Sequence, residues 1–120
     1  MGLEISQEGY VHINGGGLIS NGEPAPAGIE EIVLVESGGI VKAKLVFTDD
    51  GMGRRAYLWL QGNAIVASEA LPRGEVDEYV VYNSQGIPVM WIDSGGTMRL
   101  RGLVYVAEAL VRDVWNWPFS

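Results

Sequence analysis

The chain has 120 residues, enough for one domain with a hydrophobic core, and 48% of them are hydrophobic, which favours a folded protein over a disordered one. Fifteen acidic residues against eight lysines and arginines give a formal net charge of −7, which argues against nucleic-acid binding. Cysteine is absent, so disulfides and thiolate chemistry are excluded, and no apolar run approaches the roughly 20 residues of a membrane span.

The N-terminal part predicts a hairpin followed by a connector. Residues 5–13 alternate around a central glycine, which permits a tight reversal, and Gly15-Gly16-Gly17 then interrupts the strand. Residues 21–28, NGEPAPAG, hold two prolines two positions apart, which cannot both donate to a strand ladder. We therefore predict a division into residues 1–28, a hairpin arm with a proline-rich connector of the kind that reaches onto a neighbour, and residues 29–120, the main β domain.

Beyond the connector, short apolar runs alternate with glycine, asparagine and proline. This punctuation is typical of strands, and the 17 glycines, about twice the average share of roughly 7%, mark the turns. Residues 103–114 fit either a helix or a buried strand, and we predict a strand. The other predicted strands are residues 18–19, 29–36, 40–47, 57–61, 64–67, 79–82, 88–92 and 97–101, and the predicted loops are residues 48–55, 71–78 and 83–86.

One phrase occurs three times along the chain. It consists of an apolar residue, a glycine four positions on, two alternating apolar residues and a closing glycine, and it predicts a strand, a reversal and a second strand. Internal duplication and chance recurrence both explain such a pattern. The copies are Ile5, Gly9, Val11, Ile13, Gly15; then Phe47, Gly51, Leu58, Leu60, Gly62, with a loop five residues longer; then Ile92, Gly96, Met98, Leu100, Gly102.

The fold predicted from these segments is all-β. It is a glycine-rich antiparallel β-sandwich or barrel-like domain with an extended N-terminal arm and an aromatic C-terminal tail. Many short strands separated by glycine-rich turns are typical of such architectures. A domain of this kind exposes strand edges, and association with other copies covers them.

Residues that carry chemistry are few and scattered. His12, the single histidine, lies between two apolar strand positions and is expected on the face opposite the core, although a Ser-His-Asp triad would need it. Asp49-Asp50 is typical of a turn and lacks the spacing of a calcium loop. Gly15-Gly16-Gly17 precedes no helix, so it makes a poor phosphate site. We predict no catalytic residue, metal or cofactor.

Two pairs of residues are candidates for contacts with other molecules. Trp59 and Trp91 lie mid-strand, where core packing is the first interpretation and a sugar-binding aromatic face is the alternative. Arg54 and Arg55 form a small basic spot in an acidic protein. They either belong to a solvated loop or close an ion pair between subunits.

The C-terminal tail carries large aromatic residues. Chain ends usually fray and tolerate polar residues, so this composition predicts a docked tail, on its own domain or in a neighbouring subunit. Tryptophan is enriched at interface hot spots, where burial of one is worth ~2 kcal/mol or more. The predicted interface residues are Trp115, Trp117, Pro118, Phe119, Arg54 and Arg55.

The segment of residues 79–102, YVVYNSQGIPVMWIDSGGTMRLRG, resembles a phrase seen in bacteriophage tail-fibre and other virion proteins, and in some microbial surface proteins. The shared form is an aromatic-apolar strand, Asn-Ser-x-Gly, an apolar strand that ends in Ile-Asp, a glycine turn and a strand that closes in glycine. The resemblance implies side-by-side or intertwined β structure, commonly in trimers, that serves as a connector or decoration without catalysis.

We therefore predict a non-enzymatic structural or assembly protein of a virion, either a capsid decoration or a tail component. Its copies are expected to form homo-oligomers, with a trimer as the first expectation, through strand-edge and terminal-arm contacts. The negative charge is expected to keep free subunits soluble. The alternatives are a microbial cell-surface filament or adhesion module, and a carbohydrate-binding module that presents Trp59 or Trp91.

Overall fold

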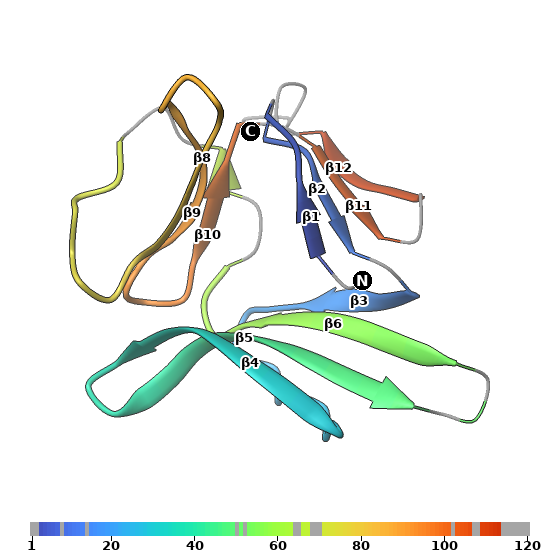
Figure 1. Ribbon diagram of the computed structural model, residues 1–120. Helices are drawn as coiled ribbons and strands as arrows, with labels where there is room; N and C mark the ends of the chain where they lie inside the picture. Colours follow the sequence, from blue (N-terminus) through green and yellow to red (C-terminus); the bar gives the residue numbers. More distant parts are fainter. Residues whose placement is uncertain are drawn as a thin grey trace.

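The structure of the protein, a computed structural model, is built from strands alone in the part of the chain that it describes (Figure 1). The described residues are 3–7, 9–13, 15–49, 51, 53–63, 66–67, 71–101, 103–106 and 109–113. Their twelve strands form three four-stranded sheets, which lie like the sides of a triangle in Figure 1. The predicted all-β class is confirmed, and the sheets do not close into a barrel.

Neighbouring strands are mostly antiparallel, but each sheet contains one parallel pair: β2–β11, β3–β6 and β7–β10. In order across each sheet, sheet A consists of β1 (Leu3–Ile5), β2 (Val11–Ile13), β11 (Leu103–Val106) and β12 (Ala109–Asp113); sheet B of β3 (Gly15–Ile19), β6 (Arg54–Leu60), β5 (Ile40–Asp49) and β4 (Glu30–Ser37); and sheet C of β7 (Val66–Ala67), β10 (Met98–Leu100), β9 (Pro88–Ile92) and β8 (Tyr79–Tyr82).

The repeated phrase forms three hairpins, one in each sheet: β1–β2, β5–β6 and β9–β10. The first and third copies share one register, since Ile5 lies opposite Val11 and Ile92 lies opposite Met98. The phrase therefore specifies the same local structure at two distant places in the chain.

The turns of these two hairpins are also alike. In each turn the glycine N–H donates to the carbonyl oxygen of the first turn residue, Gly9 to Ser6 at 3.0 Å and Gly96 to Asp93 at 2.9 Å. Both glycines have positive φ, 85° and 81°, in the left-handed region that costs other residues a steric penalty. The glycine of the phrase is therefore required by the backbone of the turn.

The middle hairpin is longer than the other two. β5 continues to Asp49 and β6 begins at Arg54, so both strands enter the segment predicted as a loop over residues 48–55. Leu58 consequently pairs with Leu45, and Phe47, which the phrase aligned with Ile5 and Ile92, lies opposite Ala56 instead.

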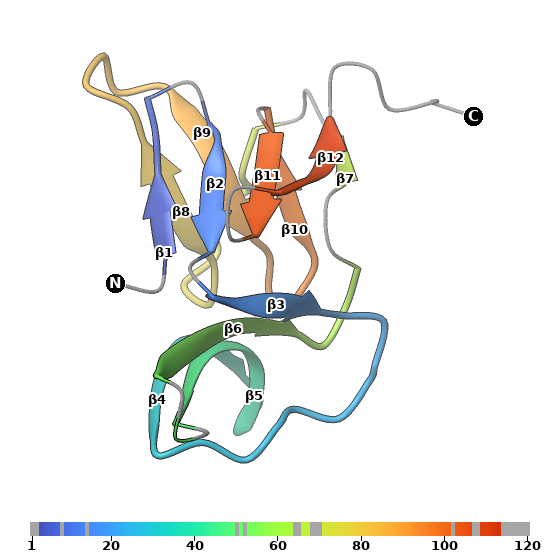
Figure 2. The same ribbon diagram turned by 90° about the vertical axis from the view of Figure 1, so that its right-hand side faces the viewer.

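After each hairpin the chain crosses to the next sheet. β2 leads into β3 of sheet B, β6 leads into β7 of sheet C, and β10 leads into β11 of sheet A. In each sheet, the strand that arrives from the neighbouring sheet pairs in parallel with the second strand of that sheet's hairpin: β3 with β6, β7 with β10 and β11 with β2. The three units therefore interlock in a closed cycle, which the views in Figures 1 and 2 show from two sides.

Gly62 lies where the chain crosses from sheet B to sheet C. Its N–H donates to the carbonyl of Gly96 at 3.1 Å, and its carbonyl accepts from the N–H of Asn21 at 2.7 Å. A Cβ atom at this position would collide with the hydroxyl and the backbone of Thr97. The closing glycine of the middle phrase thus permits a close approach of two sheets.

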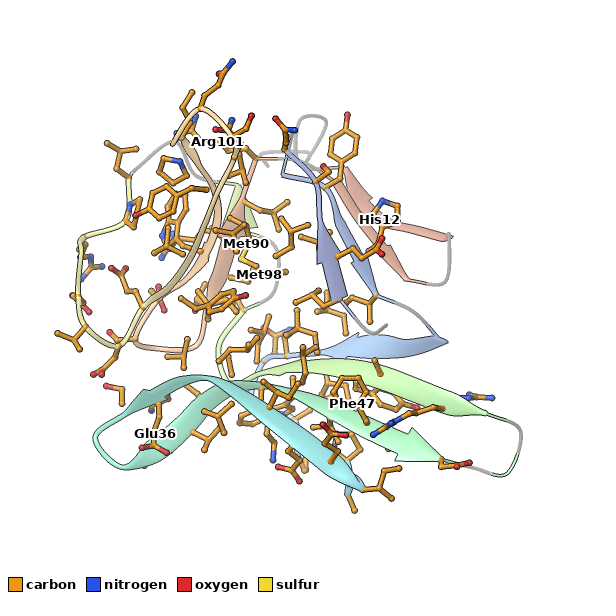
Figure 3. The ribbon with its side chains drawn as sticks, viewed as in Figure 1. His12, Glu36, Phe47, Met90, Met98 and Arg101 are labelled. Atoms are coloured by element: carbon orange, nitrogen blue, oxygen red, sulfur yellow. The ribbon has the colours of Figure 1, made fainter. Side chains whose placement is uncertain are left out.

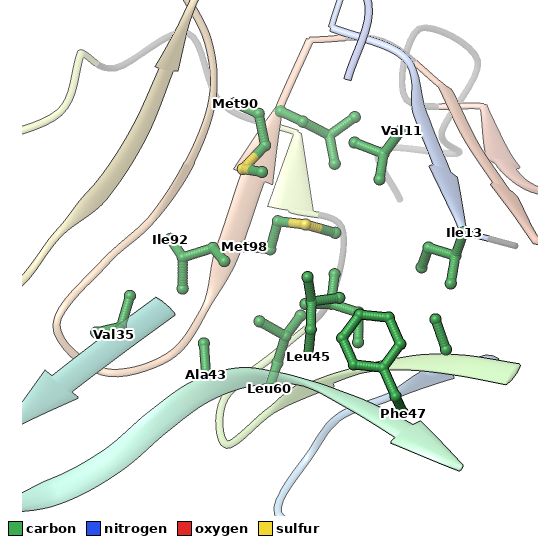
Figure 4. Packing of buried hydrophobic residues seen from close by; sticks show 13 residues of the cluster. Val11, Ile13, Val35, Ala43, Leu45, Phe47, Leu60, Met90, Ile92 and Met98 are labelled. Atoms are coloured by element: carbon green, nitrogen blue, oxygen red, sulfur yellow. The ribbon is translucent and has the colours of Figure 1, made fainter. Parts of the chain in front are cut away.

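The core occupies the space that the three sheets enclose. Figure 3 shows Met90 and Met98 between the sheets, and Figure 4 shows how side chains from all three meet there. Residues that face each other across a hairpin share one side of the sheet, so each hairpin supplies a paired apolar row. The buried cluster consists of Val11, Ile13, Val35, Ala43, Leu45, Phe47, Ala56, Leu58, Leu60, Met90, Ile92, Met98 and Leu100.

The N-terminal segment differs from the extended arm predicted for it. β2 pairs with β11, β3 pairs with β6, and the side chains of Val11 and Ile13 are fully buried. Gly15-Gly16-Gly17 lies within β3 instead of interrupting the strand structure. The hairpin was predicted, but its partners are far along the chain, and these distant pairings draw it into the sheets.

The segment from residue 103 to residue 113 is extended. β11 and β12 pair antiparallel, with a shift of register between Val104 and Tyr105. The prediction of a strand is confirmed over the helical alternative for residues 103–106 and 109–113.

Candidate functional site

One edge of sheet B keeps a regular backbone. β4 is the outermost strand, hydrogen-bonded within the described part of the chain to β5 alone. Residues 30–33 follow an unbroken register on β5, and shifts of register occur only beyond Val33. Bulges are one of the features that protect an edge from further pairing, and this stretch has none. We call residues 29–33 the β4 edge.

The β4 edge exposes apolar side chains on both faces of the sheet. Ile29 is 66% exposed, Ile32 is 44% exposed and Val33 is 49% exposed. Ile32 lies opposite the buried Leu45 and Val33 lies opposite Lys44, so the two residues belong to opposite faces. A further strand at this edge would extend both rows and remove apolar surface from water, at about 25 cal/mol per Å².

The charges of the β4 edge are paired within the chain. The Nη2 atom of Arg54 lies 2.5 Å from a carboxylate oxygen of Glu30, and Nζ of Lys44 lies 2.6 Å from a carboxylate oxygen of Glu31. The Arg54 guanidinium also lies 5.3 Å from the ring centre of Phe47. Exposed pairs of this kind stabilise a fold by less than about 1 kcal/mol, but they balance the two glutamates of the edge.

The outer face of sheet C carries a second feature. The loop of residues 71–78 passes over this face in Figure 1, and beneath it Trp91 is only 2% exposed although it points away from the central core. Between the loop and the sheet lies a partly open cavity of about 150 Å³, which we call the sheet C cavity. Its lining residues are Leu71, Arg73, Glu78, Trp91, Asp93 and Arg99.

Hydrogen bonds hold the loop side of the sheet C cavity. The Ser94 hydroxyl, in the β9–β10 turn, donates to a carboxylate oxygen of Glu75 at 2.8 Å. The N–H of Glu75 donates to the Glu78 carboxylate at 2.9 Å, and Nη1 of Arg73 lies 3.5 Å from the Glu75 carboxylate. The loop is thus tied to the sheet that it covers.

Asp93 orients the sheet side of the same cavity. One carboxylate oxygen accepts from the N–H groups of Gly95 and Thr97, both at 3.0 Å, and the other lies 3.4 Å from Nε of Arg99. Among the described residues none hydrogen-bonds to the two Nη groups of Arg99. Arg99 lines the cavity, and its Nη groups are hydrogen-bond donors by chemistry.

Trp59 lies on the outer face of sheet B beneath the connector of residues 21–28. Its Nε1–H donates to the carbonyl of Glu23 at 2.6 Å, and Nζ of Lys44 lies 5.8 Å from its ring centre. A Cβ at Gly28 would collide with the side chain of Val46, so the connector lies close against the sheet. The connector and the loop of residues 71–78 thus cover equivalent faces of two sheets.

The remaining sequence candidates lie apart from one another. His12 lies opposite Glu4 on the outside of sheet A, away from the core (Figure 3). Arg55 lies opposite Thr48 and is exposed. No group of three or more His, Asp or Glu side chains able to hold a metal ion occurs among the described residues. The predicted interface residues Trp115, Trp117, Pro118 and Phe119 lie outside those residues.

Comparison with protein-family models, with curated proteins and with solved structures finds no match for this chain. Residues 79–102 include β8, β9 and β10, an antiparallel run of strands in sheet C, and their resemblance to virion proteins stays a prediction. The described residues include no helix long and apolar enough to cross a membrane.

Sequence reasoning missed both surface features. Residues 29–33 alternate only weakly, with two glutamates before two β-branched residues, and this weak alternation was the available signal of a strand exposed on both faces. The sheet C cavity joins residues of the loop to Asp93 and Arg99 of a hairpin. No sequence spacing relates a loop to the face that it covers.

Proposed function

We propose that this chain is a non-enzymatic structural protein whose copies assemble through the β4 edge. The supporting observation is a regular strand edge with exposed Ile29, Ile32 and Val33 and with its charges already paired within the chain. An edge of this kind is a ready template for pairing with another strand. In this proposal the chain acts by binding other copies of itself and catalyses no reaction.

A second copy of the chain is the partner that fits this edge. Each copy carries a net charge of −7, so association favours a surface where charge is low or balanced, and the β4 edge has two internal ion pairs. Two β4 edges that pair with each other give a two-fold dimer, whereas pairing of β4 with a different edge gives a ring or a filament. The predicted trimer belongs to the second arrangement.

The proposed setting is a virion, as a capsid decoration or tail component. The support is the resemblance of residues 79–102 to virion proteins, and these residues include the central hairpin of sheet C. A microbial cell-surface filament would use the same edge.

Light scattering coupled to size-exclusion chromatography tests the assembly. The mass of the full chain is measured over a range of concentrations, beside a double variant with Ile32→Lys and Val33→Lys. Val76→Lys is the matched control, because Val76 is 98% exposed on the loop of residues 71–78 and lies outside the edge. We expect an oligomeric mass for the parent chain and the control, and a monomeric mass for the double variant.

A second experiment uses a chain that lacks residues 115–120 and so tests the predicted aromatic interface separately. Circular dichroism and the denaturant midpoint verify that each variant folds. A parent chain that stays monomeric at every concentration contradicts the proposal, as does an oligomer whose mass the double variant leaves unchanged.

A further inference from the structure

We propose that the sheet C cavity is a binding site for a single neutral saccharide unit. This inference does not rest on the proposed assembly, because the cavity and the β4 edge belong to different sheets. It rests on the size of the cavity, its mixed apolar and polar lining and its balanced charges.

The cavity has room for one six-membered ring. Its volume of about 150 Å³ is similar to that of an engineered protein cavity that holds benzene, a six-membered ring. A pyranose ring fits such a space if its hydroxyl groups reach the walls and the opening. A longer glycan would place one residue inside and continue outside.

The walls of the cavity offer both apolar and polar contacts. Leu71, which is 65% exposed, contributes apolar surface that suits the C–H face of a pyranose, whereas Trp91 lines the cavity with only 2% of its surface exposed. Asp93 and Glu78 contribute carboxylates, and Arg99 contributes N–H donors that no described residue occupies. A hydroxyl group both donates and accepts, so a polyol can use carboxylate and guanidinium together.

The balance of charge favours a neutral ligand over an ion. Two arginines, Arg73 and Arg99, and two acidic residues, Glu78 and Asp93, are among the residues that line the cavity. An anion drawn to the arginines would meet both carboxylates, and a cation would meet both guanidinium groups. A neutral polyol is repelled neither by the carboxylates nor by the guanidinium groups.

The site is also held in place before a ligand arrives. Ser94 ties the loop to the β9–β10 turn through Glu75, and Asp93 holds both the turn and Arg99. Preorganised walls lower the entropy that binding costs. Affinity is nevertheless expected in the millimolar range, because one ring offers few atoms for contact.

Nuclear magnetic resonance titration of the full chain tests the site. The probes are glucose, galactose, mannose and N-acetylglucosamine, with sodium acetate and methylammonium as charged competitors. The indole N–H signal of Trp91, assigned by its loss in Trp91→Phe, reports occupancy. We expect saturable shifts of this signal with at least one sugar and none with either ion.

Two variants and one control decide the residues involved. Arg99→Lys keeps the charge but loses the planar fork, and Arg73→Ala alters a side chain that is 74% exposed and so is tolerated by the fold. Each is expected to weaken binding about tenfold, a change typical of one lost charge-assisted hydrogen bond. Arg55→Lys, the same change on sheet B, is expected to leave binding unchanged. The proposal is overturned by absence of binding to all four sugars, by equal binding to both variants and parent, or by displacement of the sugar by either ion.

Discussion

Sheets B and C share one plan and differ in what they expose. Each consists of an edge strand, a hairpin from the repeated phrase and a parallel strand delivered from the preceding unit, β3 in sheet B and β7 in sheet C. Each also has an outer face covered by a preceding segment, residues 21–28 over sheet B and residues 71–78 over sheet C.

The differences lie in strand length and in the fit of the covering segment. β4 has eight residues and exposes Ile32 and Val33 in its first half, whereas β8 has four residues. The connector bonds closely to Trp59, whereas the loop over Trp91 leaves a cavity. The inner rows thus specify a common scaffold, and the outer and edge positions are free to carry an assembly surface on one sheet and a ligand site on the other.

The largest effects are expected where the two sheets are alike. Leu58 and Met98 occupy the same place in the repeated phrase, and both are fully buried. Leu58→Ala and Met98→Ala should each lower the free energy of unfolding by about 3 kcal/mol, through lost burial and the cavity left behind. Denaturant unfolding of each variant measures this. A loss below about 1 kcal/mol at either position would show that the sheet concerned does not share the common core.

Smaller and unequal losses of stability are expected at the turn glycines of the β5–β6 and β9–β10 hairpins. Gly51 and Gly96 occupy the same place in the phrase and have similar φ, 85° and 81°. A Cβ at Gly51 meets open space, whereas one at Gly96 would collide with the carbonyl oxygen of Lys42 in sheet B. Gly51→Ala should therefore cost about 1 kcal/mol and Gly96→Ala at least twice as much. If denaturant unfolding shows the same loss of stability for Gly51→Ala and Gly96→Ala, the close contact between Gly96 and sheet B does not contribute to stability.

An effect as small as that of Gly51→Ala is expected at the covering segments. Trp59→Phe keeps most of the aromatic surface but removes the hydrogen bond from Nε1 to the Glu23 carbonyl, so the free energy of unfolding should fall by about 1 kcal/mol. Limited proteolysis within residues 21–28 should become faster, because the connector loses its bond to the sheet. Trp91→Phe serves as the comparison and should leave proteolysis of the connector unchanged.

The sequence predicted the local structure better than the pairings. Glycine with positive φ and alternating apolar residues are short-range signals, so the β1–β2 and β9–β10 hairpins and the turn at Asn83 followed from spacing alone. The parallel pairs did not, because β3 and β7 are short and join partners that lie far along the chain.

The candidate sites were predicted less well than the fold. Trp91 was expected to be buried in the core, and it is buried, but beneath a loop on the opposite face. The placement of Arg54 at an interface between subunits stays a prediction, and within its own chain Arg54 forms an ion pair with Glu30. The loop over Trp91 and the ion-pair partner of Arg54 are both set by which segment lies beside the residue, and local sequence spacing does not reveal that neighbour.

Hydrogen exchange at two protein concentrations tests the central claim most directly, that copies meet at the β4 edge. The Ile29 N–H already donates to the carbonyl of Phe47 in β5, so the informative amides of residues 29–33 are those that point away from β5. These amides should exchange about tenfold more slowly in concentrated than in dilute protein, because a second copy covers them. The amides of β8, the edge of sheet C, should exchange at the same rate in both. Equal rates for residues 29–33 at both concentrations, or slowing confined to β8, would contradict the account.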